Sequence, residues 1–194
     1  MHHKIATVVF LSLAAALVGV SFTAAGGGVV GAVYTMTNSP AGNEVLVYDR
    51  MADGSLSYAG AYDTGGFGSG DGLGNQGGVV LSANKRWLLV VNAGSDELSV
   101  FEVRRDGLAL TDVADSGGVR PISVAIEKDL VYVVHAGGSV GSTDSVSGFR
   151  LDNHGDLVYL AGSSSPLSGT ATGPAQVGFS SDGRFLLVTE KGTS

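Results

Sequence analysis

Three side chains in this sequence have the types needed for acid–base chemistry on a carbonyl group: Glu190, His135 and Arg120. A carboxylate or an imidazole whose pKa lies near neutrality can take the proton of an attacking water. A guanidinium can hold a substrate carboxylate or stabilise the negative oxygen that develops on the carbonyl. Gln76 and Gln176 could serve beside them as neutral hydrogen-bond donors. These residues are far apart along the chain, so a fold has to bring them together.

A repeated pattern of short strands supplies such a fold. Each repeat reads as a strand, a turn rich in Gly, Asn or Asp, a second strand and a turn closed by Gly, which is Asp-Gly in the first two repeats. Gly54, Gly107 and Gly155 close equivalent turns at a spacing of about 50 residues. Repeats of this length with several short strands are typical of propeller blades. We therefore predict an all-β fold, a β-propeller built from four-stranded antiparallel blades.

The predicted strands fall into four groups, of which the first lacks an innermost strand and the last lacks two outer ones. By group they are Val33–Thr37, Val45–Asp49 and Ser57–Tyr62; Gly78–Ser82, Trp87–Asn92, Glu97–Val103 and Leu110–Ala114; Pro121–Ile126, Leu130–His135, Ser145–Arg150 and Leu157–Gly162; Ala175–Ser180 and Arg184–Glu190. About three blades' worth of sheet cannot close a ring, since propellers need at least about four blades. The pattern therefore predicts the front part of a longer propeller, with an incomplete ring.

Polar side chains recur at one end of these blades. Inner strands begin where second strands end, so the residues at those two places meet at one rim of the central channel, where a rigid scaffold holds functional loops. The starts of inner strands give Gln76, Arg120 and Gln176, and the ends of second strands give Asn38, Asn92, His135 and Glu190. We assign Glu190, His135 and Arg120 as candidate catalytic residues and Gln76, Gln176 and Asn92 as candidate substrate-binding residues.

Each of these residues also has a purely structural interpretation. Asn92 stands before Ala-Gly and is a good turn former. His135 would serve equally well as a strand cap, and Arg120 as a solvated loop residue. Glu190 is followed by Lys191, with which it would form a surface ion pair of little energetic value.

Composition narrows the range of partners. The net charge is −7 and the 11 Lys and Arg residues are scattered, so neither nucleic acid nor an anionic membrane surface is an expected partner. The chain has no cysteine, which excludes disulfides, thiol catalysis and thiolate metal sites. No His residue has zinc-ligand spacing to Asp or Glu, so we expect no metal and no cofactor.

The N-terminus has the three parts of a secretory signal. A short basic start, "MHHK", precedes the uncharged apolar run Ile5–Val20 and then the small residues "SFTAAGGG". The predicted organisation is a signal peptide and leader over residues 1–32 and a partial propeller over residues 33–194, with cleavage near Ala25 or at Ala32. The mature protein would be periplasmic or extracellular and free of the membrane. An uncleaved anchor is the alternative, although the run is shorter than the roughly 20 residues of a membrane span.

Several stretches resemble one known family. "VYTMTN", "GNEVLVYDR", "GLGNQGGVVLS", "RWLLVVNAGSDELSVFEV", "GGVRPISVAI" and "GPAQVGFSSDGRFLLVTEKG" resemble exported members of the seven-bladed lactonase family, which includes 6-phosphogluconolactonase-like and carboxymuconate-cyclase-like propellers. The resemblance implies that about three and a half of seven blades are present. It also implies a metal-free hydrolase that opens or forms a lactone ring at the channel mouth, with Glu, Arg and His as site residues.

The implied substrate is a small-molecule lactone or carboxylate. Gln176 departs from the family pattern, since several relatives have His at that place. The alternative function is a binding propeller without chemistry, whose rim holds a protein or a ligand of the cell envelope.

Overall fold

A computed structural model describes residues 28–192, and almost every element in it is a β strand. The predicted signal peptide lies outside these residues. In chain order the strands are β1 (Val29–Met36), β2 (Glu44–Met51), β3 (Leu56–Asp63), β4 (Val79–Leu81), β5 (Trp87–Asn92), β6 (Glu97–Arg104), β7 (Gly107–Asp115), β8 (Pro121–Glu127), β9 (Leu130–Ala136), β10 (Asp144–Leu151), β11 (Leu157–Tyr159), β12 (Ser165–Pro166), β13 (Pro174–Phe179) and β14 (Leu186–Glu190). A short 3-10 helix, η1 (Gly137–Val140), follows β9.

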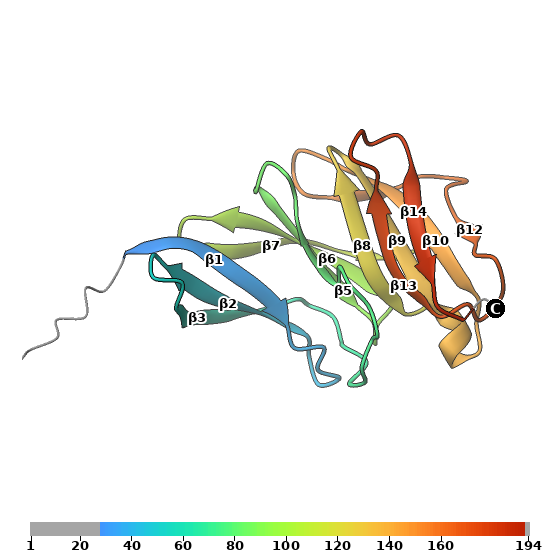
Figure 1. Ribbon diagram of the computed structural model, residues 1–194, viewed down its shortest axis with the longest axis horizontal. Helices are drawn as coiled ribbons and strands as arrows, with labels where there is room; N and C mark the ends of the chain where they lie inside the picture. The colour runs from blue at the N-terminus through green and yellow to red at the C-terminus, as the bar shows by residue number, and fades with distance from the viewer. Residues whose placement is uncertain (1–27, 193–194) are drawn as a thin grey trace, which may run out of the picture.

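The strands form four antiparallel sheets that follow one another along the chain. Their orders are β1-β2-β3, β4-β5-β6-β7, β8-β9-β10-β11 with β12 added beside β10, and β13-β14. We call these sheets blades 1 to 4. Figure 1 shows them standing side by side, from blade 1 in blue and teal to blade 4 in red. The predicted all-β propeller of antiparallel blades is confirmed, and among the described residues blade 1 has no inner strand and blade 4 has only two strands.

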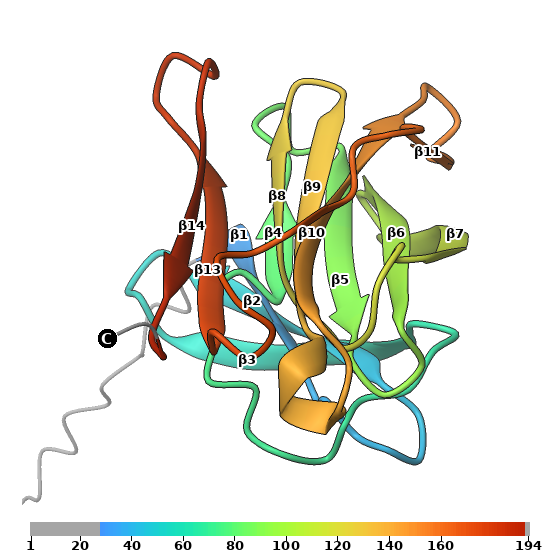
Figure 2. The same ribbon diagram turned by 90° about the vertical axis from the view of Figure 1, so that its right-hand side faces the viewer.

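The two ends of the blades carry different loops and turns. We call the end where inner strands begin and second strands end the channel rim; η1 lies at this end, at the bottom of Figure 2. The opposite end carries the turns between inner and second strands, such as residues 82–86 and 128–129, and we call it the hairpin rim. The β8–β9 and β13–β14 turns stand at this end, at the top of Figure 2.

Some strand ends differ from the predicted ones because a strand ends where its backbone pairing ends, and the hydrophobic pattern alone does not show this. β1 begins at Val29, inside the range predicted as leader, and Val29 lies opposite Met51 of β2. β7 begins at Gly107, since the Asp-Gly turn lets Arg104 and Gly107 pair directly. β11 ends at Tyr159, earlier than predicted.

Strand β5 shows why the blades stack. All six of its residues are buried, because it is central in its sheet and covered on both faces. Successive side chains of a strand point to opposite faces. Leu89 and Val91 therefore pack in the cluster shared with blade 3, whereas Leu88 and Val90 pack in the cluster shared with blade 1.

Strand β9 repeats this arrangement one blade further along. Val131 and Val133 face blade 2, and Val134 and Ala136 pack with Val177 of blade 4. Burying each of these valine side chains is worth about 1.5–3 kcal/mol. The hydrophobic clusters between blades therefore hold the strand ends in place, and these ends carry the candidate site residues.

Candidate functional site

The six predicted site residues lie at or near the channel rim, but in different environments. Asn92 and His135 are fully buried, Arg120 and Glu190 are half-buried, and Gln76 and Gln176 are exposed. Burial separates residues that support the fold from residues that a substrate can reach.

Asn92 joins blade 1 to blade 2. Its side-chain oxygen accepts hydrogen bonds from Asn43 Nδ2 at 2.9 Å and from the Thr64 hydroxyl at 2.8 Å. Its Nδ2 donates to Ser99 Oγ at 2.7 Å. A buried amide needs such partners, because each unpaired polar group costs free energy. The geometry assigns Asn92 to the contact between blades, not to a substrate.

His135 takes the same place between blades 2 and 3. Its side chain is 0% exposed; Nε2 lies 3.0 Å from the Ser116 carbonyl oxygen, and Nδ1 lies 3.3 Å from the Ser145 hydroxyl. Burial lowers the pKa of His135, and its hydrogen bonds with Ser116 and Ser145 offset this in part. An imidazole without solvent access is poorly placed to take a proton from an attacking water. Its position favours the structural interpretation over the predicted catalytic one.

The two buried side chains are held by one repeated motif. Residues 63–66 read "DTGG" and residues 115–118 read "DSGG". In each motif the Thr or Ser hydroxyl forms a hydrogen bond with the buried side chain. The last glycine of the motif packs directly against that side chain. We call this arrangement the Asn/His seam.

Gly118 of the Asn/His seam has no room for a side chain. A Cβ at this position would lie 2.6 Å from the His135 ring, far inside van der Waals contact. We expect Gly118→Ala to lower the free energy of unfolding by about 2 kcal/mol, since overpacking of this kind forces neighbours to shift. Urea unfolding measures the effect. Gly72→Ala is the matched control, because a Cβ at Gly72 would meet no atom within 4 Å, and equal losses in both variants would contradict the role of the seam.

Arg120 lies in a cleft of about 350 Å³ at the channel rim, together with Ser69, Asp71 and Asp96. Its backbone is in the left-handed region (φ 59°) and is held there by a 2.6 Å hydrogen bond from its N–H to the Asp96 carboxylate. Within residues 28–192 the guanidinium forms no hydrogen bond or ion pair. A guanidinium without a partner can bind a negatively charged oxygen.

Glu190 ends β14 and is fixed by blade 3. Its carboxylate accepts the backbone N–H of Ser168 at 3.2 Å and also the Ser168 hydroxyl. The expected ion pair with Lys191 is not formed, because Lys191 Nζ donates instead to the Gly74 carbonyl oxygen at 2.7 Å. The carboxylate keeps partial solvent access and lone pairs that are not used by Ser168.

The two glutamines lie close together in the fold. The backbone N–H of Gln76 donates to the carbonyl oxygen of Ala175, the residue before Gln176, at 3.0 Å. Gln176 also lines a groove of about 390 Å³ between the inner strands β4, β8 and β13, beside Val80 and Val124. Both amide side chains have no partner among the described residues, as expected for groups that meet a ligand.

The rim therefore offers Arg120, Glu190, Gln76 and Gln176 to a ligand. Arg120 and Glu190 belong to neighbouring blades and do not contact each other in the described part of the chain. Sequence reasoning missed Asp96, whose signal is an acidic residue four positions after the end of a second strand. Over residues 28–192, no group of three or more His, Cys, Asp or Glu side chains is arranged to hold a metal ion.

No protein-family model matches the sequence, and no curated protein matches it. Several solved structures match its fold. A putative 6-phosphogluconolactonase from Bacteroides fragilis matches with a TM-score of 0.62 and 19% identity, over 82% of this chain and 47% of that chain. The periplasmic gluconolactonase PpgL of Pseudomonas aeruginosa matches with a TM-score of 0.52 and 20% identity, over 87% and 44%. A functionally unknown protein from Desulfotomaculum acetoxidans matches with a TM-score of 0.59 and 16% identity, over 78% and 45%.

These likenesses establish the fold: the chain has a propeller architecture like that of these solved structures. It spans less than half the length of each of the three solved structures.

Proposed function

We propose that the chain is part of an exported, lactonase-like hydrolase that opens or closes a lactone ring at the channel mouth. The observation that carries the proposal is the free guanidinium of Arg120 in a rim cleft with the carboxylates of Asp71 and Asp96. Two of the structurally similar proteins are described as gluconolactonases or 6-phosphogluconolactonases, which supports a lactone as the substrate class. Export rests on the signal pattern of the first residues, and the periplasmic location of PpgL agrees with it.

The residues suit ester hydrolysis in a simple sequence of steps. A carboxylate takes one proton from a water, and the water oxygen bonds to the lactone carbonyl carbon. Arg120 stabilises the negative oxygen that forms there, or holds a carboxylate elsewhere on the substrate. The ring C–O bond then breaks, and the leaving alkoxide takes a proton to give a hydroxy acid. Gln76, which precedes β4 of blade 2, and Gln176, in β13 of blade 4, would orient the substrate from the two blades beside blade 3.

Two carboxylates compete for the role of base. Glu190, predicted from the sequence, is fixed by Ser168 and keeps partial solvent access. Asp71 shares the cleft with Arg120, and its side chain has no hydrogen-bond partner among the described residues. We keep Glu190 as the proposed base and name Asp71 as its structural competitor.

Turnover of lactones by the full-length protein tests the proposal. We expect acid release from glucono-δ-lactone or a simple aliphatic lactone, and a loss of about 100-fold in kcat/KM for Arg120→Ala, the scale of one lost oxyanion donor. Glu190→Gln should lose about 100-fold or more if Glu190 is the base, whereas the same loss in Asp71→Asn would move that role to Asp71. Asp53→Asn is the control, since Asp53 lies in the exposed β2–β3 turn.

The second candidate function is a binding propeller without catalysis. The burial of His135 favours it, because one of the three predicted catalytic residues then takes no part in chemistry. A well-folded full-length protein that hydrolyses no lactone would leave binding as the better account, whereas an Arg120→Ala variant as active as the wild type would show that Arg120 is not a catalytic residue. In the described part of the chain no helix is long and apolar enough to cross a membrane.

A further inference from the structure

A carboxylate holds the start of the inner strand in the same way in two neighbouring blades. In blade 3, Arg120 stands directly before β8, and its N–H donates to the Asp96 carboxylate at 2.6 Å. In blade 4, Gly173 stands directly before β13, and its N–H donates to the Asp144 carboxylate at 3.1 Å. Each carboxylate lies at the start of the third strand of the preceding blade. The contact is therefore a repeated feature of the fold, which we call the carboxylate anchor.

The two anchored residues share an unusual backbone conformation but differ in type. Arg120 and Gly173 both have a φ of 59°. Glycine adopts this left-handed region freely, whereas the Cβ of any other residue makes it costly. The anchor thus suits glycine, and arginine is the less stable occupant. Non-glycine residues held in such conformations cluster at functional sites, so this place indicates a role for the Arg120 guanidinium beyond the fold.

Asp96 has a left-handed backbone as well. Its φ is 62°, and it lines the same rim cleft as Arg120. Its carbonyl oxygen accepts the N–H of Ser116 at 2.9 Å, which ties Asp96 to the Asn/His seam. The Arg120 guanidinium has no hydrogen bond or ion pair of its own within residues 28–192. Its direction therefore depends on the backbone that Asp96 holds.

We propose that Asp96 is a positioning residue for Arg120 in the lactonase site, a role that rests on the proposed function. The Asp96 carboxylate keeps the Arg120 backbone left-handed, and this conformation sets where the guanidinium stands in the rim cleft. Asp96 then contributes to turnover only through Arg120 and takes no proton itself. The stability lost by placing arginine on an anchor that suits glycine is offset in function by a preorganised cation.

Two replacements of Asp96 separate the anchor from the charge. Glycine tolerates the left-handed backbone but removes the acceptor, whereas asparagine tolerates it and keeps a side-chain oxygen. We expect Asp96→Gly to lower the kcat/KM of the full-length protein for its lactone about tenfold, since a misplaced group loses much of its effect. The loss should fall in the same parameter, kcat or KM, that Arg120→Ala changes. Asp96→Asn should be close to the wild type, and an equal loss in both variants would overturn the proposal.

A double-mutant cycle distinguishes positioning from any effect that bypasses Arg120. In the Arg120→Ala background, Asp96→Gly should cause no further loss of kcat/KM, because the guanidinium that Asp96 orients is already gone. A base or a general support of the fold would be missed equally in both backgrounds. A second loss of the same size in the double variant would therefore contradict the assignment.

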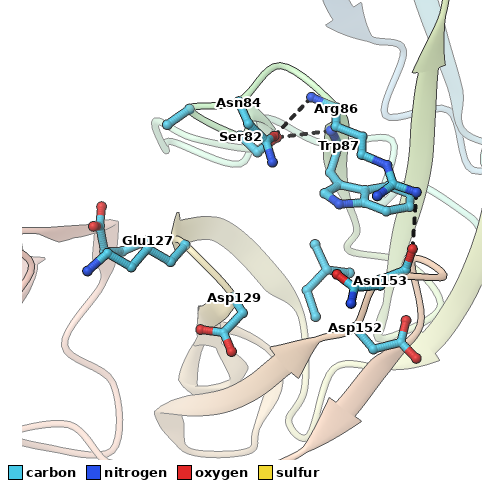
Figure 3. Close-up of a pocket in the computed structure, with 11 residues that line it drawn as sticks. Ser82, Asn84, Arg86, Trp87, Glu127, Asp129, Asp152 and Asn153 are labelled. Carbon is cyan, nitrogen blue, oxygen red and sulfur yellow. Dashed lines mark hydrogen bonds between the residues drawn. The ribbon is translucent and has the colours of Figure 1, made fainter.

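Lys85→Gly is the matched control, because Lys85 is also left-handed, with a φ of 61°, and lies at the opposite, hairpin rim. Its turn lines a separate cleft of about 440 Å³ and is held by its own side chains Ser82 and Asn84, as Figure 3 shows. This variant should turn over substrate like the wild type. A loss as large as that of Asp96→Gly would show that removing a left-handed side chain anywhere lowers activity.

Amide hydrogen exchange reports on the anchor without any substrate. The Arg120 N–H should exchange about tenfold faster or more in Asp96→Gly, and at the wild-type rate in Asp96→Asn, because a hydrogen bond protects it. Unchanged protection in Asp96→Gly would refute the anchor. A wild-type protein that hydrolyses no lactone contradicts the proposed function and this role with it, whereas normal turnover in Asp96→Gly contradicts this role alone.

Discussion

Asp144→Ala is expected to lower the free energy of unfolding by about 3 kcal/mol, the largest loss of stability among the substitutions considered. Asp144 is 1% exposed and begins the third strand of blade 3. Its carboxylate accepts the backbone N–H of Gly138 at 2.8 Å, of Thr172 at 2.6 Å and of Gly173 at 3.1 Å, and also the Thr172 hydroxyl at 3.1 Å. These bonds tie η1 and the approach to blade 4 to one side chain.

The size of the loss follows from Thr172, which is 2% exposed. Alanine would leave its N–H and hydroxyl without acceptors, and each buried group left unpaired costs about 1–3 kcal/mol. Urea unfolding followed by Trp87 fluorescence and circular dichroism measures the change. The control is Asp129→Ala, which removes an exposed ion pair with Arg150 and should cost less than about 1 kcal/mol. Similar losses in the two variants would show that Asp144 does not hold the blades together.

Acid should weaken the wild-type protein through His135, and His135→Asn should remove most of this dependence. Burial lowers the pKa of His135 in the folded state below the value of about 6.5 found in an unfolded chain. Between these two pKa values the unfolded chain binds more protons, so stability increases with pH. The contribution is fully present above about pH 6.5 and is lost as the pH falls through the folded-state pKa.

The groups that contact or face His135 determine how far its pKa is lowered. Ser116 and Ser145 bond its nitrogens, and Asp96 and Asp115 are the charged groups near it; these contacts oppose the effect of burial only in part. Asparagine is the natural replacement, since Asn92 occupies the same place in blade 2. Unfolding free energies measured from roughly pH 7 to about pH 5 should fall for the wild type and for His154→Asn, an exposed control, but change much less for His135→Asn. Parallel pH curves for all three proteins would contradict the prediction.

The strands could be predicted well because their signals are local. The bounds predicted for Trp87–Asn92 agree with β5 to the residue, since a long apolar run lies between a polar turn and an Ala-Gly turn. The errors are at strands whose ends depend on a neighbour. β7 gains residues by pairing with β6, and η1 replaces part of the loop predicted after β9. The short β12 exists only because the chain returns to pair with β10.

The candidate site was predicted less completely. The ends of strands correctly indicate which residues reach the channel rim, and Arg120 and Glu190 are found there with partial solvent access. Nothing in the local sequence shows that the "DSGG" motif folds over His135 and encloses it. Asp96 was missed for the same kind of reason, because its hydrogen bond with Arg120 links residues 24 positions apart.

The sequence by itself determined the class of fold, the number and order of the blades present, and the rim at which polar residues gather. Turn chemistry and the alternation of apolar residues act over a few positions, so they can be interpreted without coordinates. Only the tertiary structure decided which polar residues are exposed. Neighbouring blades enclose Asn92 and His135 and leave the Arg120 guanidinium without a partner among the described residues. Burial depends on contacts between distant segments, and these contacts set hydrogen bonding, pKa and access to a ligand.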